Sequence, residues 1–154
     1  MSIYFLDSSA LAKRYVTEAG SAWVKDLTDP SAHNPLIISR ITWVEVLSAL
    51  ARRRREGNLS PDDVAQAIRT FRHDLNTQYQ VSELDAVLAE TAGRLVDRHP
   101  LRAYDAVQMA SALQVQLDLK QAKGPALTFL AADDNLLAIA QTEGLLTDNP
   151  NHHP

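Results

Sequence analysis

The chain has 154 residues, of which 45% are hydrophobic and 22% are charged, and its formal net charge is −4. This length and balance predict a single globular domain, and they exclude a disordered chain, a membrane-spanning protein and a general positively charged coat for nucleic acid. The absence of cysteine excludes disulfides and thiolate metal sites, and the early carboxylate at position 7 argues against a signal peptide, so we expect a cytoplasmic protein.

The first half of the chain alternates short apolar runs with helical patterns. In chain order it predicts a strand at residues 3–6, helices at 8–16 and 21–27, a strand at 36–39, and helices at 41–55 and 61–76. Gly57 lies just beyond the third helix, where glycine commonly ends one. Ser60 and Pro61, followed by two acids, form a strong start signal for the fourth helix, because serine caps free N–H groups and proline is tolerated in the first turn.

The second half continues the alternation. It predicts a weak strand at 80–83, helices at 85–98 and 103–117, a strand at 127–131, a helix at 135–142 and a short strand at 145–147. Strands alternating with helices are typical of an α/β domain with a mainly parallel sheet. We find no repeat or linker, so residues 1–148 are interpreted as one domain. Residues 149–154, with His152 and His153, are interpreted as a frayed tail and not as a zinc site, because no further ligands with zinc spacing are evident.

Four acidic residues lie at junctions of the predicted elements: Asp7, Glu45, Asp105 and Asp133. Asp7 and Asp133 follow predicted strands, and parallel sheets bind ligands beyond the carboxyl ends of their strands. Clustered carboxylates are how proteins hold hard divalent cations such as Mg²⁺ or Mn²⁺. We therefore predict a catalytic metal centre with Asp7 and Asp105 as the main ligands, to which Glu45 and Asp133 bind directly or through water.

Each acid also has an explanation that needs no metal. Asp7 can cap the helix that follows it, and Asp105, in the first turn of its helix, suits the helix dipole. Glu45 can belong to a solvated stripe, because polar and basic side chains recur on that face of its helix. Either Asp133 or Asp134 can cap the next helix, and we favour Asp133 as the ligand because it comes first after the strand.

Basic charge is concentrated at the end of the predicted helix 41–55. The candidate phosphate-binding side chains are Arg52, Arg53, Arg54 and Arg55, together with Lys13 and Arg14 on the first helix. Such a run is most often only a solvated helix end. If these side chains instead hold nucleic-acid phosphates, affinity falls as salt is added, because binding releases counterions.

Four segments, in order, resemble the blocks of a known family. IYFLDSSALAKRYVTEAGS is similar to the opening of PIN-domain proteins, specifically the VapC-type toxins of bacterial toxin–antitoxin pairs. ISRITWVEVLSALARRRREGNLS resembles the second block, with its glutamate at Glu45. LRAYDAVQMASAL resembles the third, with its aspartate at Asp105, and LTFLAADDNLLAIAQTEGLLTDNP resembles the last, with its aspartate at Asp133. The match covers nearly the whole chain.

The resemblance implies a three-layer α/β/α fold around a mainly parallel sheet, and a ribonuclease that depends on Mg²⁺ or Mn²⁺. It also implies an RNA substrate such as a tRNA, a homodimer and a cognate VapB-type antitoxin. The family often carries Ser or Thr two residues before its last aspartate, where this chain has Ala131. Ser8 or Ser9 can supply a similar supporting hydroxyl.

Two other classes of function compete with the nuclease. A PIN-like module with an impaired centre would bind RNA or a protein without cutting; the four retained acids argue against it and Ala131 argues for it. A phosphatase acting on small phosphoesters is distinguished by testing a chromogenic phosphoester against RNA.

Overall fold

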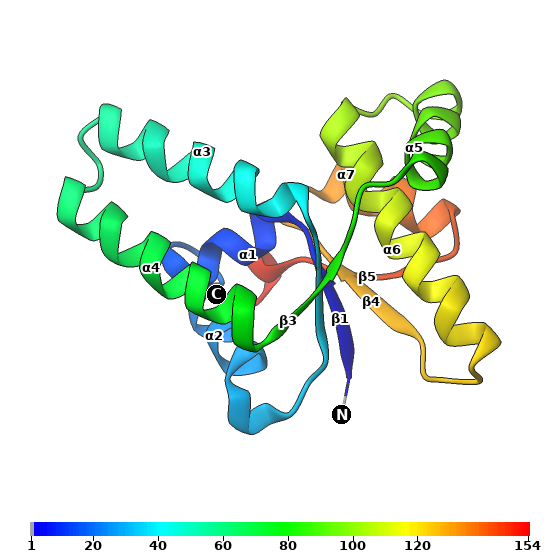
Figure 1. Cartoon of the computed structure of the whole chain (residues 1–154), viewed down its shortest axis with the longest axis horizontal. Helices are drawn as coiled ribbons and strands as arrows, with labels where there is room; N and C mark the ends of the chain where they lie inside the picture. Colours follow the sequence, from blue (N-terminus) through cyan, green and yellow to red (C-terminus); the bar gives the residue numbers. More distant parts are fainter. Residues whose placement is uncertain (1) are drawn as a thin grey trace.

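The computed structural model describes residues 2–154, so Met1, which the predicted domain 1–148 includes, lies outside the described residues. The strands are β1 (Ile3–Leu6), β2 (Leu36–Ser39), β3 (Tyr79–Ser82), β4 (Leu127–Leu130) and β5 (Leu146–Asp148). Within residues 2–154 all strand pairings are parallel, in the order β3-β2-β1-β4-β5. The predicted parallel sheet is confirmed (Figure 1).

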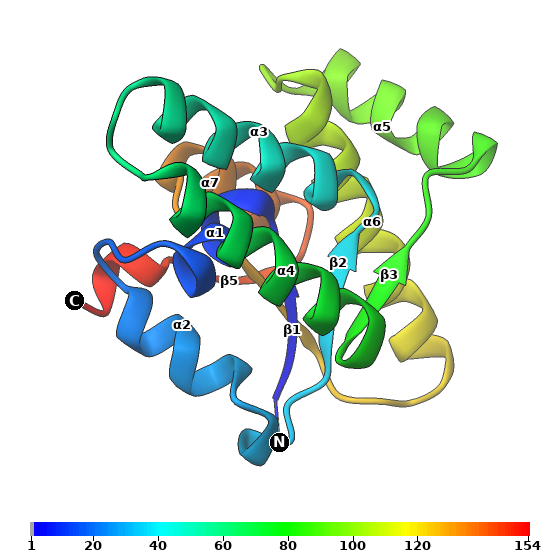
Figure 2. The same ribbon diagram turned by 60° about the vertical axis from the view of Figure 1, so that its left-hand side comes forward.

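Helices cover both faces of this sheet, as Figures 1 and 2 show. They are α1 (Ser8–Tyr15), α2 (Ser21–Thr28), α3 (Ile41–Arg55), α4 (Pro61–Thr77), α5 (Ala86–Arg98), α6 (Ala103–Gln121) and α7 (Asp134–Thr142), with short 3₁₀ turns at Pro30–Ala32 and Pro150–His152. Helices α1–α4 pack on one face and α5–α7 on the other, which confirms the predicted three-layer fold. Over residues 2–154, every helix is too short or too polar to cross a lipid bilayer.

The strands bury side chains on both faces and so separate two hydrophobic cores. In β1, Ile3 and Phe5 join the core beneath α5–α7, whereas Leu6 joins the core beneath α1–α4. This alternation follows from the two-residue period of a strand. Phe129 fills the first core, with its ring centroid 5.9 Å from that of Phe5. Burial on both faces is characteristic of a parallel sheet and fixes the position of β1 at its centre.

The connection order reverses on the two sides of β1. The chain adds β2 and β3 on one side through α1–α4, and then crosses to the other side for β4 and β5. Leu6 of β1 is in register with Leu130 of β4, so the loops that follow these two strands begin side by side. A switch point of this kind opens a crevice beyond the carboxyl ends of the strands. Asp7 and Asp133 lie in these two loops.

The predicted element boundaries differ from the observed ones by a few residues. Helix α6 continues to Gln121, four residues past its predicted end, because Leu119 still packs on the core beneath α5–α7. Strand β3 starts at Tyr79, one residue early, because the Tyr79 side chain is buried under α4. In both cases packing sets the boundary of the element, and the local sequence pattern carries no information about that packing.

Residues 149–154 do not form the predicted frayed tail. Asn149 is buried, and Pro150 packs directly against Gly20, whose φ of +82° at the start of α2 suits glycine. The imidazole of His153 stacks on Trp23 of α2, with ring centroids 4.1 Å apart and the planes within 4°. The prediction was wrong because the partners of this segment lie on α2, far away in the sequence.

Candidate active site

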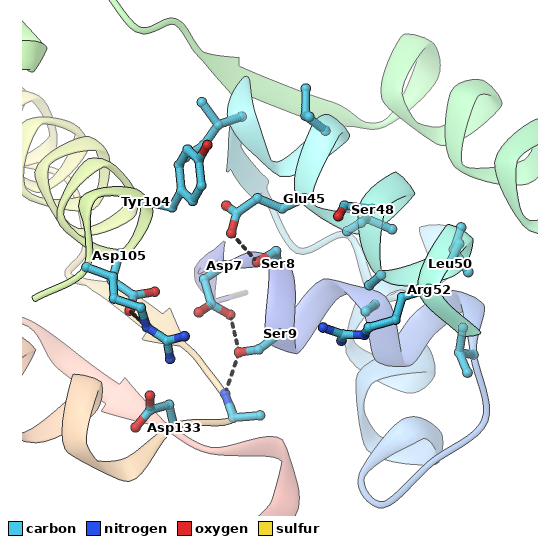
Figure 3. Close-up of a pocket in the computed structure, with 18 of the residues that line it drawn as sticks. Asp7, Ser8, Ser9, Glu45, Ser48, Leu50, Arg52, Tyr104, Asp105 and Asp133 are labelled. Atoms are coloured by element: carbon cyan, nitrogen blue, oxygen red, sulfur yellow. Dashed lines mark hydrogen bonds and ion pairs between the residues drawn. The ribbon is translucent and has the colours of Figure 1, made fainter. Parts of the chain in front are cut away.

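One cavity of about 780 Å³ opens at the carboxyl edge of the sheet, at the switch point between β1 and β4. All four acids predicted from the sequence line it: Asp7, Glu45, Asp105 and Asp133. They come from the start of α1, the body of α3, the first turn of α6 and the start of α7 (Figure 3). The fold therefore places acids from both ends of the chain around one space.

Asp7 is the most deeply buried of the four acids, with 3% of its surface exposed. Its Oδ1 accepts hydrogen bonds from the Ser9 hydroxyl at 2.7 Å and from the Ala10 N–H at 2.9 Å, which makes Asp7 the N-cap of α1. Burial raises the pKa of Asp7 to about 7 although these two bonds lower it, and the charges of Glu45 and Asp105 raise it further. A bound cation would reverse this effect, because it favours the ionised form.

The carboxylate of Glu45 is held at both of its oxygens. Oε2 accepts a hydrogen bond from the Ser8 hydroxyl of α1 at 3.1 Å, and Oε1 accepts one from the side-chain amide of Gln108 of α6 at 2.8 Å. Glu45 is half-buried, and its carboxylate points toward these two helices (Figure 3). The alternative of a solvated stripe is therefore wrong for Glu45.

Asp105 and Asp133 complete the acidic lining. The pKa of Asp105 is raised by burial; the neighbouring Arg102, whose Nε is 3.5 Å from Oδ2 of Asp105, lowers it, and the charge of Asp133 raises it. Oδ1 of Asp133 accepts two backbone N–H groups of the first turn, so Asp133 is the N-cap of α7 and Asp134 is not. The capping explanation and the ligand prediction thus fall on the same residue.

Ser9 joins the two loops of the switch point. Its hydroxyl donates to Asp7 and accepts the backbone N–H of Ala132 at 2.9 Å. Ala131, where the family often has a hydroxyl, is completely buried at the end of β4. The hydroxyl next to Asp7 in this protein therefore comes from α1 and not from the β4–α7 loop.

The acidic lining fits a hard divalent cation in donor type and in charge. Carboxylate oxygens are the ligands that Mg²⁺ and Mn²⁺ prefer, and a cation offsets the burial and the neighbouring negative charges that together raise the pKa of Asp7. As they stand, no three Asp, Glu, His or Cys side chains within residues 2–154 are close enough together to hold a metal ion. A cation bound among these carboxylates would therefore keep part of its coordination shell as water.

The four arginines at the end of α3 do not all face the cavity. Arg52 and Arg53 line the cavity, whereas Arg54 and Arg55 are exposed beyond its lining. Arg53 also forms an ion pair with Glu18, which lines the same cavity. The cavity thus has acids in its interior and two arginines along one side.

Lys13 and Arg14 of α1 are engaged within the protein, contrary to their predicted role in binding phosphate. Lys13 is 4% exposed, and its Nζ donates to Glu18 at 3.0 Å. Arg14 lies outside the cavity lining and donates to Gln78 at 2.8 Å and to Tyr79 at 2.6 Å. The sequence showed two positive charges but not the partners that already bind them within the fold.

The polar residues of the site that were not predicted from the sequence include Gln108, Arg102 and Tyr104, besides Glu18. Gln108 is buried in α6 and donates to Glu45, and Arg102 and Tyr104 are exposed at the cavity beside Asp105. Gln108 could have been found, because it lies one turn after Asp105 on the same face, within the mostly apolar first half of α6. Nothing in the sequence indicated that Arg102 and Tyr104 are exposed at the cavity.

Comparisons with known proteins agree with this architecture. The family model for the PIN domain matches residues 4–142. Two curated relatives are ribonuclease VapC45 of Mycobacterium tuberculosis strain CDC 1551 / Oshkosh and ribonuclease VapC49 of strain ATCC 25618 / H37Rv. Each is 36% identical over 115 residues, which are 75% of this chain and 78% of the relative.

Solved structures share the fold at low sequence identity. VapC20 of Mycobacterium tuberculosis, described as a sarcin-ricin loop cleaving toxin, has a TM-score of 0.63 at 21% identity and covers 93% of this chain and 96% of its own. VapBC2 from Rickettsia felis, bound to a promoter DNA fragment, has a TM-score of 0.62 at 12% identity over 96% and 98%. A toxin–antitoxin complex from Klebsiella pneumoniae has a TM-score of 0.59 at 16% identity over 97% and 98%. With the family match and the curated relatives, these findings show that the chain belongs to the PIN domain family, among the VapC ribonucleases.

Proposed function

We propose that this protein is an endoribonuclease that acts as the toxin of a toxin–antitoxin pair. The observation that carries the proposal is the cavity at the switch point, which four carboxylates from four separate segments of the chain line together. The relatives named as VapC ribonucleases support RNA as the substrate. Because both the cavity and a phosphodiester are negatively charged, the proposal requires a cation between them.

The proposed cofactor is Mg²⁺ or Mn²⁺, held by Asp7, Asp105, Glu45 and Asp133 directly or through water. When bound, such a cation polarises the scissile phosphate and lowers the pKa of water. Ser9 keeps Asp7 in place through its bond to Oδ1, and Ser8 does the same for Oε2 of Glu45. These bonds orient the carboxylates toward the cavity.

The arginines of α3 are proposed to hold the RNA strand. Arg52 and Arg53 line the cavity and bind the phosphates that flank the scissile bond. Arg53 then exchanges its ion pair with Glu18 for a phosphate oxygen. Arg54 and Arg55, exposed further along the same helix end, meet more distant phosphates of a longer RNA.

The proposed partners are an RNA such as a tRNA, a VapB-type antitoxin and a second copy of the chain. The fold shared with a toxin–antitoxin complex supports the antitoxin. Exposed apolar side chains of the β3–α5 region, including Leu84, Val87 and Val96, offer surface for assembly. An RNA target and an antitoxin together place the action of the protein in the cytoplasm.

The proposal is tested by incubating antitoxin-free protein with total cellular RNA in Mg²⁺, in Mn²⁺ and in EDTA. We expect discrete fragments that require the metal and that disappear in Asp105→Asn. The matched control is Asp118→Asn, which makes the same change at an exposed position of the same helix and should still cleave.

Two results would contradict the proposed function. If folded wild-type protein cleaved no RNA in either metal but still bound it, the impaired binding module would be supported. If it hydrolysed a chromogenic phosphoester and left RNA intact, a phosphatase would be supported instead.

A further inference from the structure

Gln108 lies in the body of α6, one turn after Asp105, and is 1% exposed. Both hydrogens of its side-chain amide are used on α3, where Nε2 donates to Oε1 of Glu45 and to Oγ1 of Thr42, each at 2.8 Å. A buried amide therefore links the helix that carries Asp105 to the helix that carries Glu45.

The contact with Gln108 completes the support of Glu45. Because Ser8 of α1 donates to Oε2 at 3.1 Å, the two oxygens of Glu45 are held from two different helices. A carboxylate fixed at both oxygens loses the freedom to rotate about its last bond. Its orientation toward the cavity is thus decided by α1 and α6 and not by α3 alone.

The side-chain oxygen of Gln108 argues against a role in stabilising the fold. Its Oε1 is buried and has no hydrogen-bond partner among residues 2–154. A buried acceptor without a partner lowers the stability of the folded state, whereas an apolar side chain of the same length would fill this place in α6 without that cost. The amide is explained by the two hydrogen bonds it donates, of which one reaches an acid of the cavity.

We propose that Gln108 is a positioning residue that holds the Glu45 carboxylate ready to receive the divalent cation. The inference rests on the proposed function and deepens it, because it assigns a role to a residue outside the acidic lining. Partners of this kind commonly tune a metal site through the ligand they hold.

The test is Mn²⁺ binding by the full chain, measured by titration calorimetry, with the free energy of unfolding in EDTA measured alongside. Gln108→Met keeps the length of the side chain and removes both donors and the unpaired acceptor. We expect Mn²⁺ affinity to fall roughly 10- to 100-fold. Stability in EDTA is measured because the variant removes the unpaired Oε1 but leaves the buried Oγ1 of Thr42 without the hydrogen bond from Gln108. Gln116→Met is the matched control, because Gln116 is also buried in α6 but donates to the backbone oxygen of Gly144, at 2.9 Å. It should leave Mn²⁺ affinity unchanged.

A double-mutant cycle with Glu45→Gln separates positioning from packing. If Gln108 acts through the Glu45 carboxylate, Gln108→Met should weaken Mn²⁺ binding in the wild-type background and have almost no further effect once Glu45→Gln is present. A packing role predicts the same loss in both backgrounds. Gln108→Asn provides a second variant, since it retains an amide that is too short by one methylene to reach Glu45, and it should lose affinity as Gln108→Met does.

The outcomes for the inference and for the proposed function differ. Wild-type affinity for Mn²⁺ in both Gln108 variants, or equal losses in both backgrounds, would overturn the positioning role while leaving the ribonuclease intact. A wild-type chain that neither binds Mn²⁺ nor cleaves RNA would overturn the proposed function, and the inference with it.

Discussion

Replacing Asp7 by asparagine should stabilise the metal-free protein at neutral pH while it abolishes the proposed cleavage. Burial raises the pKa of Asp7 from its ordinary 3.8 to about 7, so the folded chain keeps this proton at pH values where the unfolded chain has lost it. The contribution of Asp7 to the free energy of unfolding is therefore most favourable below pH 4. This contribution is lost as the pH rises through 7. Asparagine remains neutral throughout and can still cap α1 through its side-chain oxygen.

The magnitude follows from the difference between the two pKa values of Asp7. About three pH units correspond to a loss on the order of 4 kcal/mol in the free energy of unfolding above pH 7. For a chain of 154 residues this corresponds to a Tm difference on the order of 10 °C. The wild type and the variant should converge toward pH 4, where the carboxyl group is protonated in both the folded and the unfolded wild-type chain.

The assay is thermal unfolding in EDTA between pH 4 and pH 8.5, repeated with Mn²⁺. The cation should raise the Tm of the wild type more than that of Asp7→Asn, because it stabilises the ionised carboxylate. Asp85→Asn is the matched control, since it makes the same change at the exposed N-cap of α5, outside the cavity. An Asp7→Asn variant less stable than wild type at pH 8 in EDTA would refute the reasoning.

Two further predictions concern the tail and the arginines. Gly20→Ala should lower the Tm strongly in thermal melts, because a Cβ at this left-handed position would collide with the carbonyl of Pro150, and a fully stable variant would mean that the C-terminal contact is not formed. Arg52→Ala and Arg53→Ala should each weaken RNA binding and reduce the slope of affinity against salt by about 1, measured by fluorescence anisotropy. The exposed Arg94→Ala of α5 should leave that slope unchanged, and equal effects of all three would indicate only loss of net charge.

Local patterns in the sequence were sufficient for the element order and for the four acids. The strand at Leu36–Ser39 and the helix at Ile41–Arg55 are observed as predicted, because burial on both faces of a strand and capping signals at helix ends are encoded within a few residues. Asp7 and Asp133 stand next to strand ends in the sequence, so their place at the edge of the sheet follows from a parallel topology. The resemblance of four ordered segments to one family then pointed to a metal-dependent nuclease.

Only the tertiary structure decided which charges are free and which are already bound. Lys13 and Arg53 both form ion pairs with Glu18, and Gln108 of α6 donates a hydrogen bond to Glu45 of α3. The imidazole of His153 likewise stacks on Trp23. These contacts join residues far apart in the chain, so their distances depend on how the layers pack and not on the local period of the sequence. The sequence by itself determined the order of the elements and the presence of four acids at their junctions, and the packing of the layers determined the partners and the burial of these acids.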